Sequence, residues 1–254
     1  MDTQLLSRTR WLRHQRPLSL AALAAGCLWF AAALPGAASA CQARDFSFDK
    51  GWVHEPLSKL KRDTVYTLVK EEGRTVLRAV ADRSASAYVA PIQPPVSVPT
   101  SLSWRWKTDA LVPGADNRER SREDAPLRVM LAFDGDHSTL SEKEQTRFKR
   151  AKTLTGQELP YATLMYIWSE QVPVETVIPS THTSQVKMLV VASGTAGLGQ
   201  WQSVRRNVAA DYRRAYGAEP GAVLSVSVMS DTDNTGEKAV GEYADIRFDC
   251  AGAN

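Results

Sequence analysis

The sequence has few residues of the kinds that build metal centres and nucleophilic active sites. It holds four histidines and three cysteines in 254 residues, and no two histidines stand at zinc-like spacing. It lacks the Gly-x-Ser-x-Gly turn that presents a catalytic serine. The glycine-rich stretch 194–199 does not fit the dinucleotide fingerprint, which needs a complete glycine pattern in a βαβ unit. These absences argue against zinc, serine-hydrolase and dinucleotide chemistry.

Long apolar runs are also scarce, and the one that stands out lies near the N-terminus, from Leu18 to Leu34. Four arginines precede it, and Ala38-Ser39-Ala40 follows it, which is the pattern of a cleaved secretory signal. We expect cleavage before Cys41, with residues 1–40 as the signal peptide and 41–254 as one periplasmic or secreted domain. A membrane-spanning helix is the alternative, but the run is only about 17 residues long and ends at Pro35-Gly36.

Net charge is missing from the predicted mature domain. Four of the 31 basic and one of the 28 acidic residues lie in the first forty, which leaves 27 of each. A chain with no basic excess gives no reason to expect nucleic acid or anionic lipid as a partner. We expect no membrane span after cleavage.

Cysteine is equally sparse, since Cys27 leaves with the signal and only Cys41 and Cys250 remain. Two cysteines in an oxidising compartment predict one disulfide that joins the two ends of the domain. The alternative is a lipid anchor on Cys41 directly after the cleavage site, although the leucine usual in such signals is absent.

What the sequence does contain is alternation. Leu102, Trp104 and Trp106 alternate with polar residues, as do the apolar residues from Leu127 to Phe133, which is typical of strands with one buried face. Trp104 and Trp106 are therefore expected in the core. Similar runs occur at 65–69, 75–80, 162–168, 176–178, 186–192, 224–229 and 243–248. Many short strands between turn residues predict an all-β sandwich or barrel.

Two segments are predicted as helices inserted between strands. The capping box Ser141 to Glu144 starts the first, and Gly156 stops it. The second is expected from about Trp201 to Tyr216, where apolar residues recur at helical spacing before Gly217.

Candidate ligand contacts lie on loops and on the polar faces of strands. The segment Asp231 to Gly236 is interpreted as a tight turn, with a calcium-binding loop as the alternative, because closely spaced oxygens can wrap a hard cation. Arg105 and Arg128 are expected on an exposed concave sheet, provided that their strands pair. The full set of candidates is Arg105, Asp124, Arg128, Asp134, Asp136, Trp168, Asp231, Asp233 and Asn234.

Several of these stretches together resemble an exported bacterial family known as domain of unknown function 3047. The resemblance rests on residues 104–107, 124–136, 159–168, 206–212 and 231–236, and it implies no substrate or catalytic residue. The ends Phe46 to Trp52 and Tyr243 to Phe248 resemble the first and last strands of jelly-roll carbohydrate-binding modules. That likeness implies a jelly-roll-like β-sandwich with a structural calcium near Asp49 and Asp245.

These observations predict a non-enzymatic binding module for a glycan or another cell-envelope ligand. The first alternative is a carbohydrate-active hydrolase or lyase that uses carboxylates near Asp124 and Asp134/Asp136, since paired carboxylates carry out glycoside hydrolysis. The second alternative is a structural envelope protein. Calcium is the one cofactor that these patterns suggest.

Overall fold

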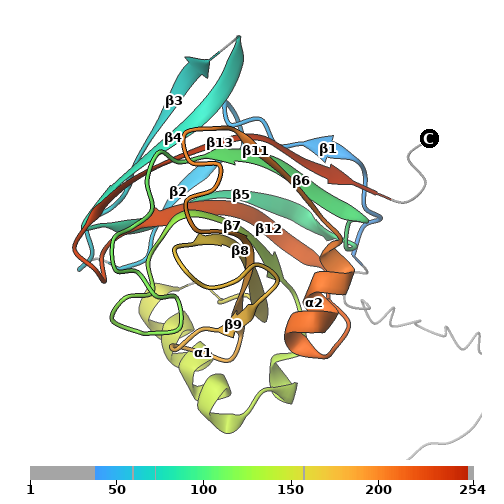
Figure 1. The fold of residues 1–254 in the computed structure, drawn as a ribbon. Coiled ribbons are helices and arrows are strands. Elements are labelled where there is room, and N and C mark those ends of the chain that lie inside the picture. The colour runs from blue at the N-terminus through green and yellow to red at the C-terminus, as the bar shows by residue number, and fades with distance from the viewer. Residues whose placement is uncertain (1–37, 59, 72, 157, 251–254) are drawn as a thin grey trace, which may run out of the picture. The chain divides into compact units, whose positions relative to one another are not determined.

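A computed structural model describes residues 38–250 of the chain, except 59, 72 and 157. The apolar run of the predicted signal lies outside the described residues. Within them the chain forms two stacked β-sheets, which Figure 1 shows nearly edge-on, and two α-helices. The prediction of an all-β, jelly-roll-like sandwich with two inserted helices is confirmed.

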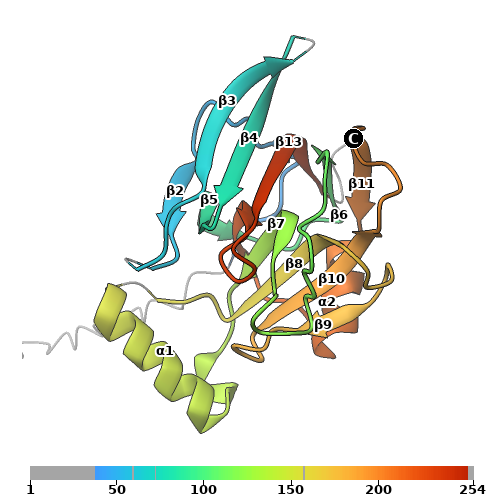
Figure 2. The same ribbon diagram turned by 60° about the vertical axis from the view of Figure 1, so that its left-hand side comes forward.

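The six-stranded sheet has the order β11-β6-β13-β4-β3, and β1 pairs with the end of β13. Its strands are β1 (Arg44–Asp45), β3 (Val65–Glu71), β4 (Arg74–Asp82), β6 (Ser101–Lys107), β11 (Gln202–Arg206) and β13 (Lys238–Asp249). The β3–β4 hairpin extends beyond the rest of this sheet (Figure 2).

The seven-stranded sheet has the order β2-β5-β12-β7-β8-β10-β9. Its strands are β2 (Val53–Pro56), β5 (Ala85–Val96), β7 (Ala125–Phe133), β8 (Ala162–Ser169), β9 (Val177–Pro179), β10 (Val186–Ser193) and β12 (Val223–Asp231). Its strand pairs in the described region are antiparallel apart from β8 and β10, which run parallel.

The core lies between the inner faces of the two sheets. Trp104 of β6 packs on Tyr166 of β8 at 5.1 Å between ring centroids, and Trp106 packs on Trp168 at 6.3 Å. All four side chains are at most 1 % exposed, as the alternation in these strands predicts for Trp104 and Trp106. Burying a large apolar side chain contributes roughly 1.5–3 kcal/mol, so these aromatic contacts are a main source of stability.

Helix α1 (Glu142–Thr155) confirms the prediction from the capping box. Ser141 accepts a hydrogen bond from the Glu144 amide, and Gly156 ends the helix in the left-handed conformation that suits glycine. Helix α2 (Val208–Tyr216) is shorter than predicted, because Gln202–Arg206 pairs with β6 as strand β11. The capping side chain of Asn207 starts the helix only after that strand.

The two ends of the domain meet. Arg44 of β1 lies opposite Phe248 of β13, and Cys41 and Cys250 form the predicted disulfide with 5.7 Å between their Cα atoms. The Sγ of Cys41 is therefore engaged and not free for a lipid. Ser39 exchanges backbone hydrogen bonds with Pro95 and Ser97, so residues next to the predicted cleavage site also contact the domain. In the part of the chain described, no helix is both long and apolar enough to cross a membrane.

Candidate functional site: an arginine groove

A groove opens in the six-stranded sheet where one edge of β13 is not paired with another strand. Strand β4 pairs with β13 only as far as Tyr243, and β1 takes over at Arg247. Between these points β13 bulges against β6, and Asp245 adopts a positive φ of 53°. A bulge bends a strand and redirects its side chains. The gap between β4 and β1 therefore becomes a cavity of about 740 Å³, within the usual range of ligand pockets.

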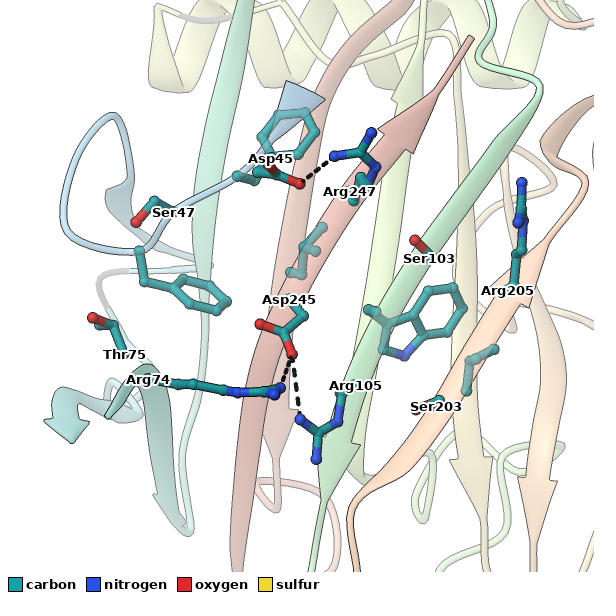
Figure 3. Close-up of a pocket in the computed structure, with 15 residues that line it drawn as sticks. Asp45, Ser47, Arg74, Thr75, Ser103, Arg105, Ser203, Arg205, Asp245 and Arg247 are labelled. Atoms are coloured by element: carbon teal, nitrogen blue, oxygen red, sulfur yellow. Dashed lines mark hydrogen bonds and ion pairs between the residues drawn. The ribbon is translucent and has the colours of Figure 1, made fainter. Parts of the chain in front are cut away.

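The groove has an apolar floor and a polar rim. Phe46, Phe48 and Ile246 are each at most 5 % exposed and belong to the sandwich core. Around them lie charged and hydroxyl side chains from five segments of the chain, drawn in Figure 3: Asp45, Ser47, Arg74, Thr75, Ser103, Arg105, Ser203, Arg205, Asp245 and Arg247. We call this cavity the arginine groove. An apolar base with a few polar groups around it is the usual form of a small-molecule or oligomer site.

Asp245 lies at the centre of the rim and is held by two arginines. The guanidinium of Arg74 donates to its Oδ2 at 2.9 Å, and that of Arg105 donates to the same oxygen at 3.3 Å (Figure 3). In the described residues these are the only side-chain hydrogen bonds of either arginine. A guanidinium has five N–H groups, so each arginine keeps several donors for a ligand.

Two further aspartates, Asp45 and Asp249, hold the other two arginines of the groove. Arg247 donates to Asp45 at 3.0 Å and to Asp249 at 2.9 Å, and Arg205 also pairs with Asp249. Hydrogen bonds from Arg247 and then Ser101 hold the pKa of Asp249 below its ordinary value. Asp249 thus stays ionised and orients both arginines.

Trp201 lies outside the lining of the groove and contacts Arg105. The guanidinium of Arg105 and the ammonium of Lys107 each lie 5.0 Å from the centre of the indole ring. Hydrogen bonds from Lys107 and Trp201 lower the pKa of Glu71. This network fixes the position of Arg105 through a cation–π contact as well as through its ion pair.

Of the predicted ligand contacts, the structure brings only Arg105 into this groove. Asp245, predicted near a calcium ion, lines the groove between arginines, while Asp49 is exposed and accepts a hydrogen bond from Ser47. Arg74, Arg205 and Arg247 were missed. Arg247 and Arg105 both alternate with apolar residues on predicted strands, and this alternation places their side chains on the outer face of a sheet. The sequence does not indicate that these two strands are neighbours.

The expected exposed sheet with Arg105 and Arg128 side by side is wrong. Strand β6 lies in the six-stranded sheet and β7 in the seven-stranded sheet, so the two arginines are on opposite faces of the sandwich. Arg128 is 1 % exposed and forms a double hydrogen bond with Asp231, at 2.7 Å and 3.0 Å. It also donates to the backbone oxygen of Glu123 and contacts the sulfur of Met188. A ligand cannot reach this guanidinium without unfolding the site.

Asp124, Asp233 and Asn234 gather next to this buried pair at the β12–β13 turn. One carboxylate oxygen each from Asp124, Asp231 and Asp233 lies within 4.8 Å of the others, so these three residues could hold a cation. Each is already engaged: Asp231 by Arg128, Asp233 by Lys61 at 2.5 Å, and Asp124 by amide and hydroxyl donors of the turn. The segment forms the predicted tight turn, with Gly236 at a positive φ.

Asp134 and Asp136 lie at the other end of β7. They line a separate cavity of about 460 Å³ with His137 and Tyr161, and hydrogen bonds from Ser138 lower the pKa of Asp136. The nine residues of β7 at about 3.3 Å each put roughly 30 Å between Asp124 and Asp134. Glycosidase carboxylates act at about 5–10 Å, so Asp124 cannot act together with this pair.

Trp168, a predicted ligand contact, is instead part of the core. It is 1 % exposed, and its indole nitrogen donates to the Gly194 carbonyl at 3.0 Å. The reason is its phase in β8, where Ala162, Leu164 and Tyr166 point the same way into the sandwich. Trp168 therefore offers no surface for stacking.

Solved structures with related folds include carbohydrate-active proteins at low identity. A family 11 carbohydrate-binding module of Clostridium thermocellum is 9 % identical, with a TM-score of 0.43, over 84 % of this chain and 97 % of that one. Endoglucanase 3 of Trichoderma harzianum, from family GH12, is 12 % identical, with a TM-score of 0.42, over 82 % and 96 %. No curated protein sequence matches the chain significantly.

A family model matches residues 50–247, which cover most of the described domain. This range runs from before β2 to Arg247 in β13, and it takes in both helices and all four arginines of the groove. It also contains the stretches on which the resemblance in the sequence rests. The chain belongs to the family described as protein of unknown function (DUF3047).

Proposed function

We propose that the chain is an exported, non-enzymatic binding module, and that the arginine groove binds a glycan or another ligand of the cell envelope. The observation that carries the proposal is the groove itself: an open cavity of about 740 Å³ with an apolar floor and a rim of hydrogen-bonding groups. Sugar rings present apolar faces and many hydroxyls, and this combination of floor and rim suits them.

The groove is built for binding rather than for hydrolysis. Among the described residues that line it, both carboxylates are engaged, Asp245 by Arg74 and Arg105 and Asp45 by Arg247. Glycoside hydrolysis uses two carboxyl groups that flank the bond, one of them as a proton donor. The groove lining contains no histidine or cysteine that could replace them.

Two further observations support export. The Cys41–Cys250 disulfide closes the domain, and structural disulfides persist mainly in oxidising compartments. The N-terminal sequence also has the charged, apolar and small-residue regions of a secretory signal. We propose that residues 41–254 are the exported domain.

A glycan screen tests the proposed function. The purified chain is run through affinity gels that contain neutral and acidic polysaccharides, and hits are measured by titration calorimetry. We expect at least one glycan to bind, and Arg105→Ala to weaken it about tenfold or more, since charge-assisted hydrogen bonds are the strong ones in such sites.

Arg213→Ala is the control for this screen. Arg213 lies on α2 and pairs with Glu219, outside the groove. Binding should be unchanged in this variant. Equal binding by Arg105→Ala and the wild type, or no binding of any glycan, would contradict the proposed function.

A further inference from the structure

The arginine groove carries a local positive charge that the rest of the domain lacks. Four arginines and two aspartates line it, and Asp249 beside it pairs with Arg205 and Arg247, so the arginines still outnumber the carboxylates by one. Residues 41–254 as a whole have equal numbers of basic and acidic residues. A cavity with an excess of one sign concentrates ligands of the opposite sign. The charge of the groove therefore points to an anionic ligand.

The ion pairs that hold these arginines are open to water. The side chains of Arg74, Arg205 and Arg247 are 55 %, 69 % and 45 % exposed, that of Arg105 is 26 % exposed, and that of Asp245 is 47 % exposed. Exposed ion pairs are weak because water and salt compete with them. An incoming anion can thus take the place of the internal carboxylate without a large loss of stability.

Asp245 shows which anion fits. Its carboxylate is bound by Arg74 of β4 and Arg105 of β6, two strands that lie on opposite sides of β13. The bulge and the positive φ of Asp245 place the carboxylate in this position. Two guanidiniums that converge on one carboxylate oxygen already bind a carboxylate in this structure, so the carboxylate of a ligand can take the same place.

We propose that the ligand of the arginine groove is an acidic glycan of the uronate type, whose carboxylates bind Arg74 and Arg105 in competition with Asp245. This inference rests on the proposed binding function and adds the chemical class of the ligand. The Ser103 and Ser203 hydroxyls, which accept or donate no hydrogen bond among the described residues, lie across from Arg205 and Arg105 and are available to sugar hydroxyls.

The test compares two polymers with the same sugar backbone, polygalacturonate and its fully methyl-esterified form, in which each charged carboxylate is replaced by a neutral ester. Titration calorimetry of the full chain at low salt should give binding of the acid at least about tenfold tighter than of the ester, since the ester cannot form charge-assisted pairs. Equal affinity for both polymers would overturn the acidic class. If neither binds while a neutral glycan from the screen does, the acidic class is also wrong and the proposed function stands; if no glycan binds, both fail.

Asp245→Asn tests the competition directly. Removing the internal charge should tighten binding of polygalacturonate by about threefold or more, since one like charge is taken out of the site. Asp82→Asn is the matched control, because Asp82 also lies between two arginines, Arg62 and Arg83, but outside the groove. An unchanged melting temperature shows that Asp245→Asn is folded. If the folded variant binds the polymer with wild-type or lower affinity, Asp245 does not compete with the ligand.

Discussion

Arg105 and Arg128 sit on outward-facing positions of strands in the two sheets, but their surroundings are opposite. Arg128 is 1 % exposed, and one carboxylate, that of Asp231, takes two of its N–H groups. The side chain of Arg105 is 26 % exposed and gives one long hydrogen bond to Asp245, which it shares with Arg74. Arg128 is held within the fold, whereas Arg105 keeps N–H donors that no described residue takes. An arginine thus indicates a binding site only when some of its N–H groups donate to no other residue of the protein.

The largest effect is expected from breaking the buried pair. Arg128→Met leaves the Asp231 carboxylate buried without its partner, which should lower the free energy of unfolding by about 3–5 kcal/mol. Urea denaturation followed by circular dichroism measures this. The double variant Arg128→Met/Asp231→Leu should regain most of the loss, because it buries no unpaired charge. A small effect of the single variant would show that the pair is not structural.

An intermediate effect is expected for Asp116 and Arg118, a pair with one buried and one exposed partner at 6 % and 57 % exposure. Hydrogen bonds from Arg118 lower the pKa of Asp116 to about 2 from an ordinary 3.8. A lowered carboxyl pKa adds stability above the ordinary value, and this stability is lost as the pH falls toward 2. The urea midpoint of the wild type should therefore fall from pH 5 to pH 2 more than that of Asp116→Asn. Parallel pH curves for the two proteins would contradict this assignment.

The smallest effect on stability is expected in the groove. Arg74→Ala and Arg105→Ala should each change the free energy of unfolding by less than about 1 kcal/mol, because their ion pairs are solvated. Ligand affinity should nevertheless fall in both, and added salt should weaken wild-type binding while leaving the urea midpoint nearly unchanged. A loss of stability as large as that of Arg128→Met would show that these arginines serve the fold.

Much of the fold could be predicted from local patterns. The alternation around Trp104 and Trp106 predicts strand β6 and its buried face, and Ser141, Glu144 and Gly156 predict both ends of α1. Strand β5 was missed because it contains Pro91, Pro94 and Pro95, which are unusual inside strands. Strand β11 was missed because Val204, which packs against the core, happens to continue the helical spacing of α2.

The site could be predicted much less well, because it depends on which strands become neighbours. Arg74 and Asp245 are 171 residues apart in the chain, and Arg105 and Asp245 are 140 apart. No local pattern encodes such pairs. The same limit explains why Arg128 was expected at the surface: its outward position on β7 was correct, but the loop residue Glu123 and the end of β12 cover it.

The most direct test of the account is to find which arginines the ligand covers. Phenylglyoxal modifies accessible arginines, and mass spectrometry can follow each one with and without saturating polygalacturonate. We predict protection of Arg74, Arg105, Arg205 and Arg247, with Arg213 modified at an unchanged rate. Binding of the polymer without protection of Arg74 and Arg105 would contradict the assignment of the arginine groove as the ligand site.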